Sequence, residues 1–275
     1  MAGCCCLPTM PDVFCELSDG PNQNDRDSSM RRALITGGAS GLGADMAAAL
    51  VAAGYQVGVM DLDREQTEAF CSHLKNAVPL VASVSDSVAV EAAFEEFGEP
   101  PDLLINNAGI VRVGPLHDQS VADYTQVINT NLLGPCICSR VAAKGMISRG
   151  SGHIINITSV NGIHPAPGVG LYAATKSALH SLTQLMSIEW GPLGIRVNSI
   201  APGFIDAGMS KPFFENQKVR EKRSSGVPLR SLGQASDITN AVLFLDSERA
   251  KYITGNEIVV DGGVTNSVFA HLPRE

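Results

Sequence analysis

A short apolar run, a glycine-rich turn and an alanine-rich segment follow one another near the start of the chain, and they constrain its fold most strongly. The run Arg31–Thr36 stops at glycines and is typical of a buried strand. Residues 37–43 read Gly-Gly-Ala-Ser-Gly-Leu-Gly, and the stretch Ala44–Ala53 favours a helix. This order places backbone N–H groups and the positive end of a helix against a phosphate. Glycines are needed there, because side chains would hold a pyrophosphate away.

The same alternation of apolar runs and helical segments continues along the chain. Further strands are expected at Gln56–Met60, Val78–Ala82, Asp102–Ile105, His153–Ile157, Ile195–Ile200 and Glu257–Val260. Further helices are expected at Glu65–Lys75, Val88–Phe97, Val121–Ser148 and Leu171–Trp190, the third of them disturbed at Gly134-Pro135. Strands that alternate with helices form right-handed crossovers, so we predict an α/β fold with a doubly wound parallel, Rossmann-like sheet. Its ligands would bind beyond the carboxyl ends of the strands.

Length and charge narrow the functional classes. The chain has 275 residues, of which 44% are hydrophobic, enough for one large core. The formal net charge of -8 argues against a nucleic-acid-binding protein, which normally presents a basic face. No apolar run approaches the length of a membrane span. We therefore expect a cytoplasmic protein that binds neither nucleic acid nor membrane.

Residues 1–29 are expected to form a disordered tail ahead of a single domain over residues 30–275. The tail shows no helical or strand period, and no basic region followed by a long apolar region marks a secretory signal. Four of the seven cysteines lie in its first fifteen residues. Cys4–Cys6 offer an acylation site, but no basic cluster accompanies them. No paired Cys-x-x-Cys with further ligands is present, so we expect no metal site.

Tyr172 and Lys176 are four residues apart in an expected helix and therefore share one face of it. The charge of the lysine would favour tyrosinate and lower the pKa of Tyr172 from its usual value of about 10. Such a tyrosine can exchange a proton with an alcohol or carbonyl oxygen. The alternative is a half-buried tyrosine beside a solvated lysine, which many helices contain by chance. The pair therefore carries weight only together with the rest of the chain.

Asp61 directly follows the second expected strand and lies 18 residues after Gly43. An acidic residue at this place binds the ribose hydroxyls of NAD, and its charge repels the additional phosphate of NADP. The alternative is a strand-end aspartate that caps Arg64 or the following helix. We favour the first interpretation, so the expected cofactor is NAD and NADP is less favoured.

Five ordered motifs together resemble those of the short-chain dehydrogenase/reductase family, in its single-domain classical type. Thr36–Gly43 is similar to the cofactor turn of that family, and Asn106–Gly109 to its sheet-stabilising motif. Pro202-Gly203 and Thr254–Gly263 resemble its later landmarks. The resemblance covers about residues 31–263, and it implies the residues of an active site.

The implied catalytic residues are Asn131, Ser159, Tyr172 and Lys176. The implied cofactor contacts are Gly37, Ser40, Gly41, Leu42, Gly43, Asp61, Val84, Asn107, Ala108, Gly109, Tyr172, Lys176, Pro202, Gly203 and Ile205. By this resemblance the chain transfers a hydride between NAD and a small-molecule secondary alcohol or ketone. Tyr172 would exchange the proton, Ser159 would bind the substrate oxygen, Lys176 would hold the nicotinamide ribose and Asn131 would place a water.

Two positions depart from the family pattern. Ser83-Val84 stands where the family often has an aspartate that touches the adenine. Ala207 stands where the family usually has a threonine that binds the nicotinamide amide. That second contact would pass to the backbone or to the neighbouring Asp206. Both departures concern cofactor affinity more than chemistry.

Two other functions stay open. One is an NADPH-dependent ketoreductase that acts on 3-oxoacyl groups, against which Asp61 argues. The other is a non-catalytic nucleotide-binding regulator, since a fold does not fix a function. A binding module has no need of all four implied catalytic residues. The resemblance also implies a homo-oligomer, a tetramer or a dimer, packed through the helices expected at Val121–Ser148 and Leu171–Trp190.

Overall fold

The strands expected from the sequence form one parallel sheet in the computed structural model, which describes residues 30–267. The strands are β1 (Arg32–Thr36), β2 (Gln56–Asp61), β3 (Ala77–Val81), β4 (Leu103–Asn106), β5 (Gly152–Ile157), β6 (Ile195–Pro202) and β7 (Glu257–Val260). Their order across the sheet is β3-β2-β1-β4-β5-β6-β7. The prediction of a doubly wound parallel α/β fold is confirmed. The tail expected at residues 1–29 lies outside the described residues, as do residues 268–275.

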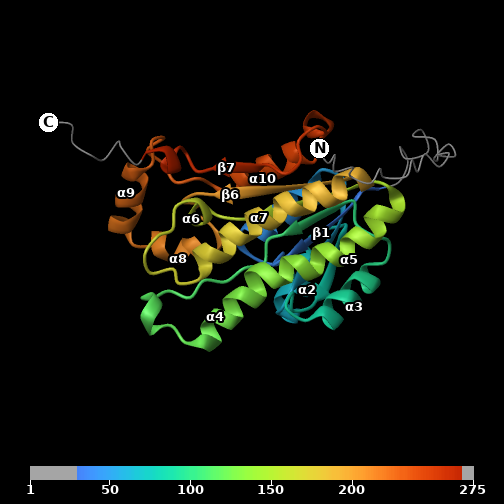
Figure 1. Ribbon diagram of the computed structural model, residues 1–275, viewed down its shortest axis with the longest axis horizontal. Helices are drawn as coiled ribbons and strands as arrows, with labels where there is room; N and C mark the ends of the chain where they lie inside the picture. Colours follow the sequence, from blue (N-terminus) through green and yellow to red (C-terminus); the bar gives the residue numbers. More distant parts are fainter. Residues whose placement is uncertain (1–29, 268–275) are drawn as a thin grey trace, which may run out of the picture. The chain divides into compact units, whose positions relative to one another are not determined.

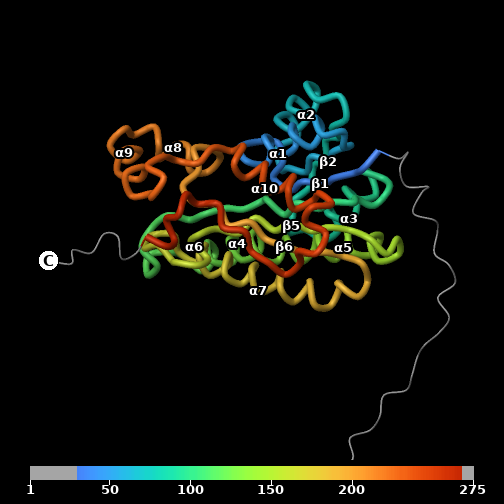
Figure 2. Tube along the Cα trace, turned by 90° about the horizontal axis from the view of Figure 1, so that it is seen from above, coloured from blue at the N-terminus to red at the C-terminus, as the bar shows by residue number. Residues whose placement is uncertain are grey.

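Helices cover both faces of this sheet (Figures 1 and 2). They are α1 (Gly41–Ala52), α2 (Arg64–Ser72), α3 (Ser87–Phe97), α4 (Val121–Ile128), α5 (Gly134–Arg149), α6 (Val160–Ile163), α7 (Tyr172–Trp190), α8 (Lys211–Phe214), α9 (Gln217–Gly226) and α10 (Ala235–Leu245). Apolar residues of α1, α2 and α10 form one buried cluster with the sheet, and those of α3, α5 and α7 form a second cluster on the opposite face. None of the helices within residues 30–267 has the length and apolar character needed to cross a bilayer.

Strands β2 and β3 lie on one side of β1, and β4 to β7 lie on the other, so the direction in which strands are added reverses at β1. This reversal opens a crevice at the carboxyl ends of β1 and its neighbours. Thr36 ends β1 and lies opposite Met60 of β2 and Asn106 of β4. Its hydroxyl oxygen accepts hydrogen bonds from the backbone N–H groups of Asn107 and Ala108, each at 3.1 Å. The side chain of Thr36 therefore holds the end of β4 beside the end of β1.

The helix expected at Val121–Ser148 is interrupted earlier and more widely than predicted. A π-helical turn spans Asn129–Leu133 between α4 and α5. Pro135 has no N–H group, so it cannot close the α-helical bond to the carbonyl of Asn131 four residues earlier. The proline therefore acts on the turn that precedes it, and Asn131 falls inside the widened segment.

Two other expectations differ from the structure. The helix expected at Glu65–Lys75 ends at Ser72, because the chain must turn before Ala77 enters β3 beside β2. Helix α10 has a buried apolar face, which includes Ile238, Val242 and Leu245, but it was not predicted. The signal was present in the sequence, because these three residues have the spacing of one helix face and Gln234 with Asp237 forms a capping box before them.

A buried polar network lies at the opposite, amino-terminal ends of the strands. Asp246, which caps the end of α10, accepts a hydrogen bond from Tyr55 at 2.6 Å and pairs with Arg31 at 2.8 Å through one carboxylate oxygen. Its other oxygen lies 2.9 Å from Nδ1 of His153. Nε2 of His153 lies 3.2 Å from the side-chain amide nitrogen of Asn198. An Nδ1–H tautomer of neutral His153 satisfies both contacts, donating to Asp246 and accepting from Asn198.

We expect this network to make the fold sensitive to acid. Burial lowers the pKa of His153 below its usual value, so the unfolded chain takes up this proton first. Burial opposes the charged form of Asp246, but the hydrogen bond from His153 and the charge of Arg31 outweigh it, so the pKa of Asp246 is also lowered. Because both pKa values are lower in the folded protein, the unfolded state binds more protons as the pH falls. The free energy of unfolding therefore falls with pH, below about pH 6.5 through His153 and below about pH 4 through Asp246.

Urea unfolding at pH 7 and pH 5 would measure this loss, and we expect the free energy of unfolding to fall by about 1 to 2 kcal/mol. A protonated His153 would turn Nε2–H toward the amide of Asn198 and would lie beside the guanidinium of Arg196, which is 3.2 Å from Nδ1. The variant His153→Gln removes the titrating group and should show a smaller difference between the two pH values. An equal difference in both proteins would contradict the assignment to His153.

Candidate active site

The glycine-rich turn leaves β1 and enters α1 with a geometry that only glycine provides. Gly37 and Gly41 have φ angles of 61° and 52°, in the left-handed region. A Cβ atom on Gly43 would lie 1.9 Å from the carbonyl oxygen of Gly37. The N-cap residue Ser40 makes no side-chain capping bond, so the first N–H groups of α1 remain available to an anionic group.

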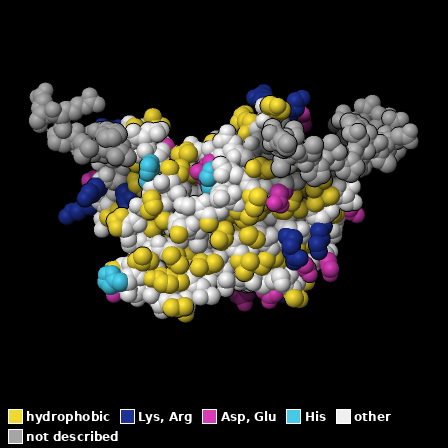
Figure 3. Space-filling model, viewed as in Figure 1, with side chains coloured by type: hydrophobic (Ala, Val, Ile, Leu, Met, Phe, Trp, Pro, Cys, Tyr) yellow, Lys and Arg dark blue, Asp and Glu magenta, His cyan; other side chains and the backbone are white. Residues whose placement is uncertain are grey.

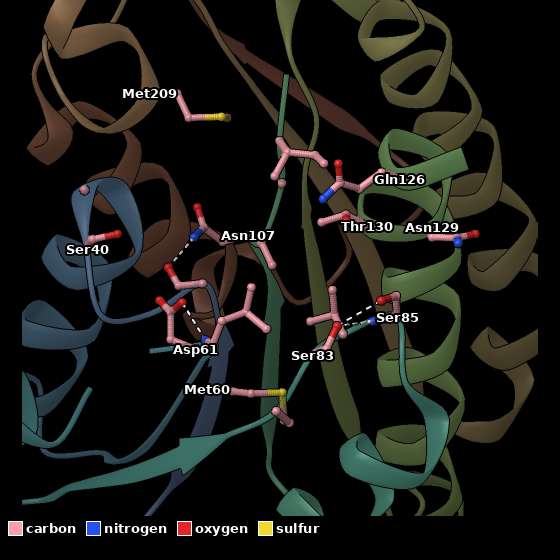
Figure 4. Close-up of a pocket in the computed structure, with 18 of the residues that line it drawn as sticks. Ser40, Met60, Asp61, Ser83, Ser85, Asn107, Gln126, Asn129, Thr130 and Met209 are labelled. Carbon is pink, nitrogen blue, oxygen red and sulfur yellow. Dashed lines mark hydrogen bonds between the residues drawn. The ribbon is translucent and has the colours of Figure 1, made fainter. Parts of the chain in front are cut away.

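A cavity of about 760 Å³ opens over this turn (Figure 4). Residues from the carboxyl ends of β1 to β4 and from the segment between α4 and α5 line it. They are Gly37, Ser40, Gly41, Leu42, Met60, Asp61, Leu62, Ala82, Ser83, Val84, Ser85, Asn107, Ala108, Gly109, Ile110, Val121, Ala122, Thr125, Gln126, Asn129, Thr130, Gly208 and Met209. Among these described residues, Asp61 has the one charged side chain.

Two backbone N–H groups fix the carboxylate of Asp61 at the edge of the cavity. One oxygen accepts from Ala39 at 3.0 Å and the other from Leu62 at 2.8 Å. The following helix is capped instead by Asp63, which accepts from the N–H of Gln66. The alternative interpretation, in which Asp61 caps that helix, therefore does not describe the structure.

Tyr172, Ser159 and Lys176 come together at the carboxyl end of β5. Ser159 directly follows that strand region and caps the short α6, while Tyr172 begins α7 and Lys176 lies one turn later. Ser159 lies near Tyr172, where its hydroxyl acts to lower the pKa of the phenol. The ammonium of Lys176 donates to the carbonyl of Ile157 at 2.7 Å and lies 5.6 Å from the ring centre of Tyr172. Strand β5 therefore anchors the lysine of the Tyr-x-x-x-Lys pair.

The expected lowering of the tyrosine pKa is wrong for this structure. Burial raises the pKa of Tyr172, and the hydroxyl of Ser159 only partly offsets that effect. Burial also lowers the pKa of Lys176 to about 8. The interior of the protein disfavours both charged forms, and the proximity of the lysine alone does not reverse this.

Asn131 lies fully buried in the π-helical turn, where its side chain binds the segment after β4. Its Nδ2 donates to the carbonyl of Ile110 and its Oδ1 accepts from the N–H of Ile110, both at 2.8 Å. Nδ2 also lies 3.3 Å from the hydroxyl of Thr175 on α7. Asn131 therefore connects the loop after β4 to the helix that carries Tyr172.

Gly109 lies between the cavity and the buried side chains of Asn131 and Lys176. A Cβ atom on it would be 3.4 Å from Oδ1 of Asn131 and 3.5 Å from the ammonium of Lys176. Since Gly109 also lines the cavity, a dinucleotide bound there can extend past this glycine toward Tyr172. The glycine turn, the carboxylate of Asp61 at the edge of the cavity and the size of the cavity all fit such a group.

The structure separates the predicted cofactor residues into two groups. The residues that line the cavity are Gly37, Ser40, Gly41, Leu42, Asp61, Val84, Asn107, Ala108 and Gly109. Those that do not line it are Gly43, Tyr172, Lys176, Pro202, Gly203 and Ile205. The N–H of Gly203 donates to Val260 at 2.9 Å, and Ile205 is buried in the core.

The loop after β6 reaches the glycine turn, although Ala207 offers no polar side chain there. A Cβ atom on Gly41 would lie 2.6 Å from Cα of Gly208. The carboxylate of Asp206 accepts a hydrogen bond from the guanidinium of Arg220 on α9. Asp206 is therefore engaged with the segment of α8 and α9, which leaves the backbone as the substitute for the missing threonine.

The wall formed by α4 and the π-helical turn was not predicted from the sequence. Thr125, Gln126, Asn129 and Thr130 line the cavity. Figure 4 shows Gln126, Asn129 and Thr130 on the side opposite Ser40 of the glycine turn. Gln126 is held there by Arg112, whose guanidinium donates to its side-chain oxygen at 2.5 Å. The one available signal was their position just before Asn131 in the chain.

Known proteins with similar sequences and structures share this architecture. Residues 37–265 match the family model described as enoyl-(acyl carrier protein) reductase. The chain is 37% identical over 243 residues to a 3-oxoacyl-(acyl-carrier-protein) reductase of Staphylococcus aureus, covering 85% of this chain and 98% of the relative.

Two similar solved structures contain a bound cofactor. A 3-oxoacyl-(acyl-carrier protein) reductase of Brucella melitensis with bound NAD superimposes with a TM-score of 0.81 at 31% identity, over 91% of this chain and 98% of that one. A gluconate 5-dehydrogenase of Burkholderia cenocepacia in complex with NADP and tartrate gives a TM-score of 0.81 at 33% identity, over 86% and 96%. From its motifs, fold and relatives, the chain belongs to the short-chain dehydrogenase/reductase family and is an oxidoreductase of the classical type.

Proposed function

We propose that the protein is an NAD-dependent dehydrogenase or reductase of a secondary alcohol or ketone. The joint placement of Tyr172, Ser159 and Lys176 at the end of β5, next to a cavity with a glycine cradle, carries this proposal. A non-catalytic regulator would need the cavity but not these three side chains near one another. The expectation of catalysis therefore rests on the catalytic tetrad of Asn131, Ser159, Tyr172 and Lys176.

In the proposed reaction the hydroxyl of Ser159 binds the substrate oxygen and stabilises the charge that develops on it. Tyr172 takes the proton of the alcohol, or returns it during reduction of the ketone. Bound NAD would supply the hydride acceptor and, in its oxidised form, a positive ring. Lys176 adds a second positive charge below Tyr172. Both charges oppose the burial that raises the pKa of Tyr172.

The preference for NAD over NADP rests on the charge of the cavity. The 2′-phosphate of NADP would approach the carboxylate of Asp61, and no lysine or arginine is among the described residues that line the cavity. A phosphate next to a carboxylate that no cation neutralises weakens binding by repulsion. Ribose hydroxyls can instead donate hydrogen bonds to that carboxylate. The two cofactor-bound relatives carry NAD in one case and NADP in the other.

Calorimetric titration of the protein with NADH and with NADPH tests this preference. We expect NADH to bind at least about tenfold more tightly, and Asp61→Asn to remove most of the difference by removing the charge. The control Glu65→Gln removes an exposed carboxylate from the neighbouring α2 and should leave the ratio unchanged. A wild-type protein that prefers NADPH would contradict the role of Asp61.

A 3-oxoacyl ketoreductase is the second candidate, because the relative from Staphylococcus aureus is a 3-oxoacyl-(acyl-carrier-protein) reductase. Two probes separate the candidates. Reduction of ethyl acetoacetate, a small 3-oxo ester, favours the second candidate. Oxidation of gluconate or of a simple secondary alcohol favours a dehydrogenase of hydroxyl groups.

We also propose that the protein is a homo-oligomer. Hydrophobic side chains gather on one face of the molecule over α4, α5 and α7 (Figure 3). Ile128, Leu133, Ile147, Leu185 and Ile188 are exposed apolar residues of these segments. Exposed apolar area of this kind is typical of a surface that a second copy covers. Sedimentation of the purified protein distinguishes a dimer or tetramer from a monomer.

A further inference from the structure

Two loops meet beside the start of α7, at the end of the molecule where α4 and α6 lie (Figures 1 and 2). The first loop, residues 110–120, leads into α4, and the second loop, residues 164–171, joins α6 to α7. Asn131 holds the beginning of the first loop through its two bonds with Ile110. The second loop ends directly before Tyr172, the first residue of α7. The geometry of both loops therefore bears on the proposed active site.

A backbone contact joins the two loops. Gly114 of the first loop forms a parallel bridge with Val169 of the second, and its N–H donates to the carbonyl of Gly168 at 3.0 Å. The carbonyl of Val169 in turn accepts from the N–H of Tyr172 at 3.2 Å. A shift of the first loop would therefore act on the residue that binds the N–H of Tyr172.

The side chain of Gln119 fills the junction between the loops. Its Nε2 atom donates to the carbonyl of Arg112 at 2.8 Å and to that of Gly114 at 3.3 Å. It also lies against Gly170, where a Cβ atom would be 2.0 Å from Oε1 and 2.3 Å from Nε2 of Gln119. Gly170 has a φ angle of 55°, which favours glycine. The amide of Gln119 is thus packed between the first loop and a residue close to Tyr172.

Gln119 differs from the residues around it in the first loop. Residues 115–118 and Ser120 are exposed, whereas Gln119 is half-buried. Gln119 does not line the cavity over the glycine turn. An apolar side chain of the same length could fill the junction but could not donate to either carbonyl. The two donated hydrogen bonds are therefore what an apolar replacement would remove.

We propose that Gln119 is a positioning residue for Tyr172, an inference that rests on the proposed function. Its amide ties the first loop to the second and so fixes the place at which α7 begins. Gln119 touches neither cofactor nor substrate, and it acts through Val169 and Gly170. A displacement of about 1 Å at a reacting group can lower a rate by about 100-fold, so a small shift of Tyr172 has a large effect.

The variant Gln119→Met tests the proposal, because methionine matches the length of glutamine and has no N–H donor. For reduction of ethyl acetoacetate with NADH we expect kcat to fall at least about tenfold. The dissociation constant of NADH, measured by calorimetry, should stay within about twofold, since the side chain lies outside the cavity. Gln66→Met is the matched control, because it makes the same exchange at an exposed position of α2, and its kcat should equal that of the wild type.

The double variant Gln119→Met/Tyr172→Phe separates positioning from a general structural role. If Gln119 acts through the phenol, the double variant keeps the same residual turnover as Tyr172→Phe alone. A further loss of about tenfold in the double variant would mean that Gln119 acts by another route, and the proposal would be overturned. A wild-type kcat in folded Gln119→Met would overturn it as well.

Hydrogen exchange provides a readout that does not depend on turnover. We expect the N–H groups of Gly114 and Tyr172 to exchange faster in Gln119→Met than in the wild type, because the loops open more often. Unchanged exchange at both groups would contradict the tie between the loops. If the wild type turns over neither ethyl acetoacetate nor gluconate, the proposed function fails and the exchange rates still decide whether Gln119 holds the loops. If Tyr172→Phe loses turnover but Gln119→Met does not, the proposed function stands and the positioning role fails.

Discussion

Replacement of Tyr172 by phenylalanine is expected to lower kcat by about 100- to 10,000-fold, because it removes the proposed proton donor and acceptor and little else. The aromatic ring remains at the start of α7, and Tyr172 does not line the cavity over the glycine turn. The dissociation constant of NADH should therefore stay within about twofold, since no hydrogen bond to the dinucleotide's adenosine half is removed. Stopped-flow or steady-state reduction of ethyl acetoacetate and calorimetry with NADH measure the two quantities.

Tyr252→Phe provides the matched control, because this tyrosine is fully exposed and lies far along the chain from the tetrad. Its kcat should equal that of the wild type. A Tyr172→Phe protein that keeps its turnover would refute the proposed mechanism. A protein that loses both turnover and NADH binding would instead show that Tyr172 supports the cavity.

Asp246→Ala is expected to give the largest loss of stability, about 3 to 5 kcal/mol of unfolding free energy. The carboxylate is almost completely buried and accepts hydrogen bonds from Tyr55 and His153 while it pairs with Arg31. Its removal leaves these buried polar groups without their acceptor, and the guanidinium without its opposite charge. Urea unfolding at pH 7 followed by circular dichroism measures the difference.

The exposed pair of His117 and Asp118 is the natural comparison for the buried pair of His153 and Asp246. Both pairs join a histidine to an aspartate, and the exposed pair does so at 3.5 Å on the surface. Asp118→Ala should change the unfolding free energy by less than about 1 kcal/mol. If the two alanine variants were equally stable, burial would not be the reason for the strength of the Asp246 network. The network lies at the amino-terminal ends of the strands, so cofactor binding in Asp246→Ala should persist where the protein remains folded.

Local sequence patterns were sufficient to predict those elements whose residues contact one another within a short stretch of the chain. The glycines at 37, 41 and 43 predicted a turn that the φ angles and close approaches require. Asp61 was placed correctly at a strand end, because a strand boundary is visible in hydrophobicity alone. The spacing of Tyr172 and Lys176 predicted a shared helix face, and the ammonium of Lys176 does lie 5.6 Å from the ring centre of Tyr172.

Contacts between distant segments could not be read in the same way. The pairing of Asp206 with Arg220 joins a loop to a later helix, and the wall around Gln126 depends on how the α4 segment closes over the glycine turn. The widened turn at Asn131 needed both Pro135 and the packing of the loop after β4.

The sequence by itself determined the parallel α/β fold and the glycine-rich turn, because periodicity and glycine positions are local properties, and it identified the proposed catalytic residues through the resemblance to a known family. Only the tertiary structure decided the electrostatic state of the site. Burial raises the pKa of Tyr172 and lowers that of Lys176 to about 8, against the expectation from their spacing. Desolvation depends on every segment packed around a group, and those segments come from β5, α6 and the loop after β4 as well as from the helix that carries the pair.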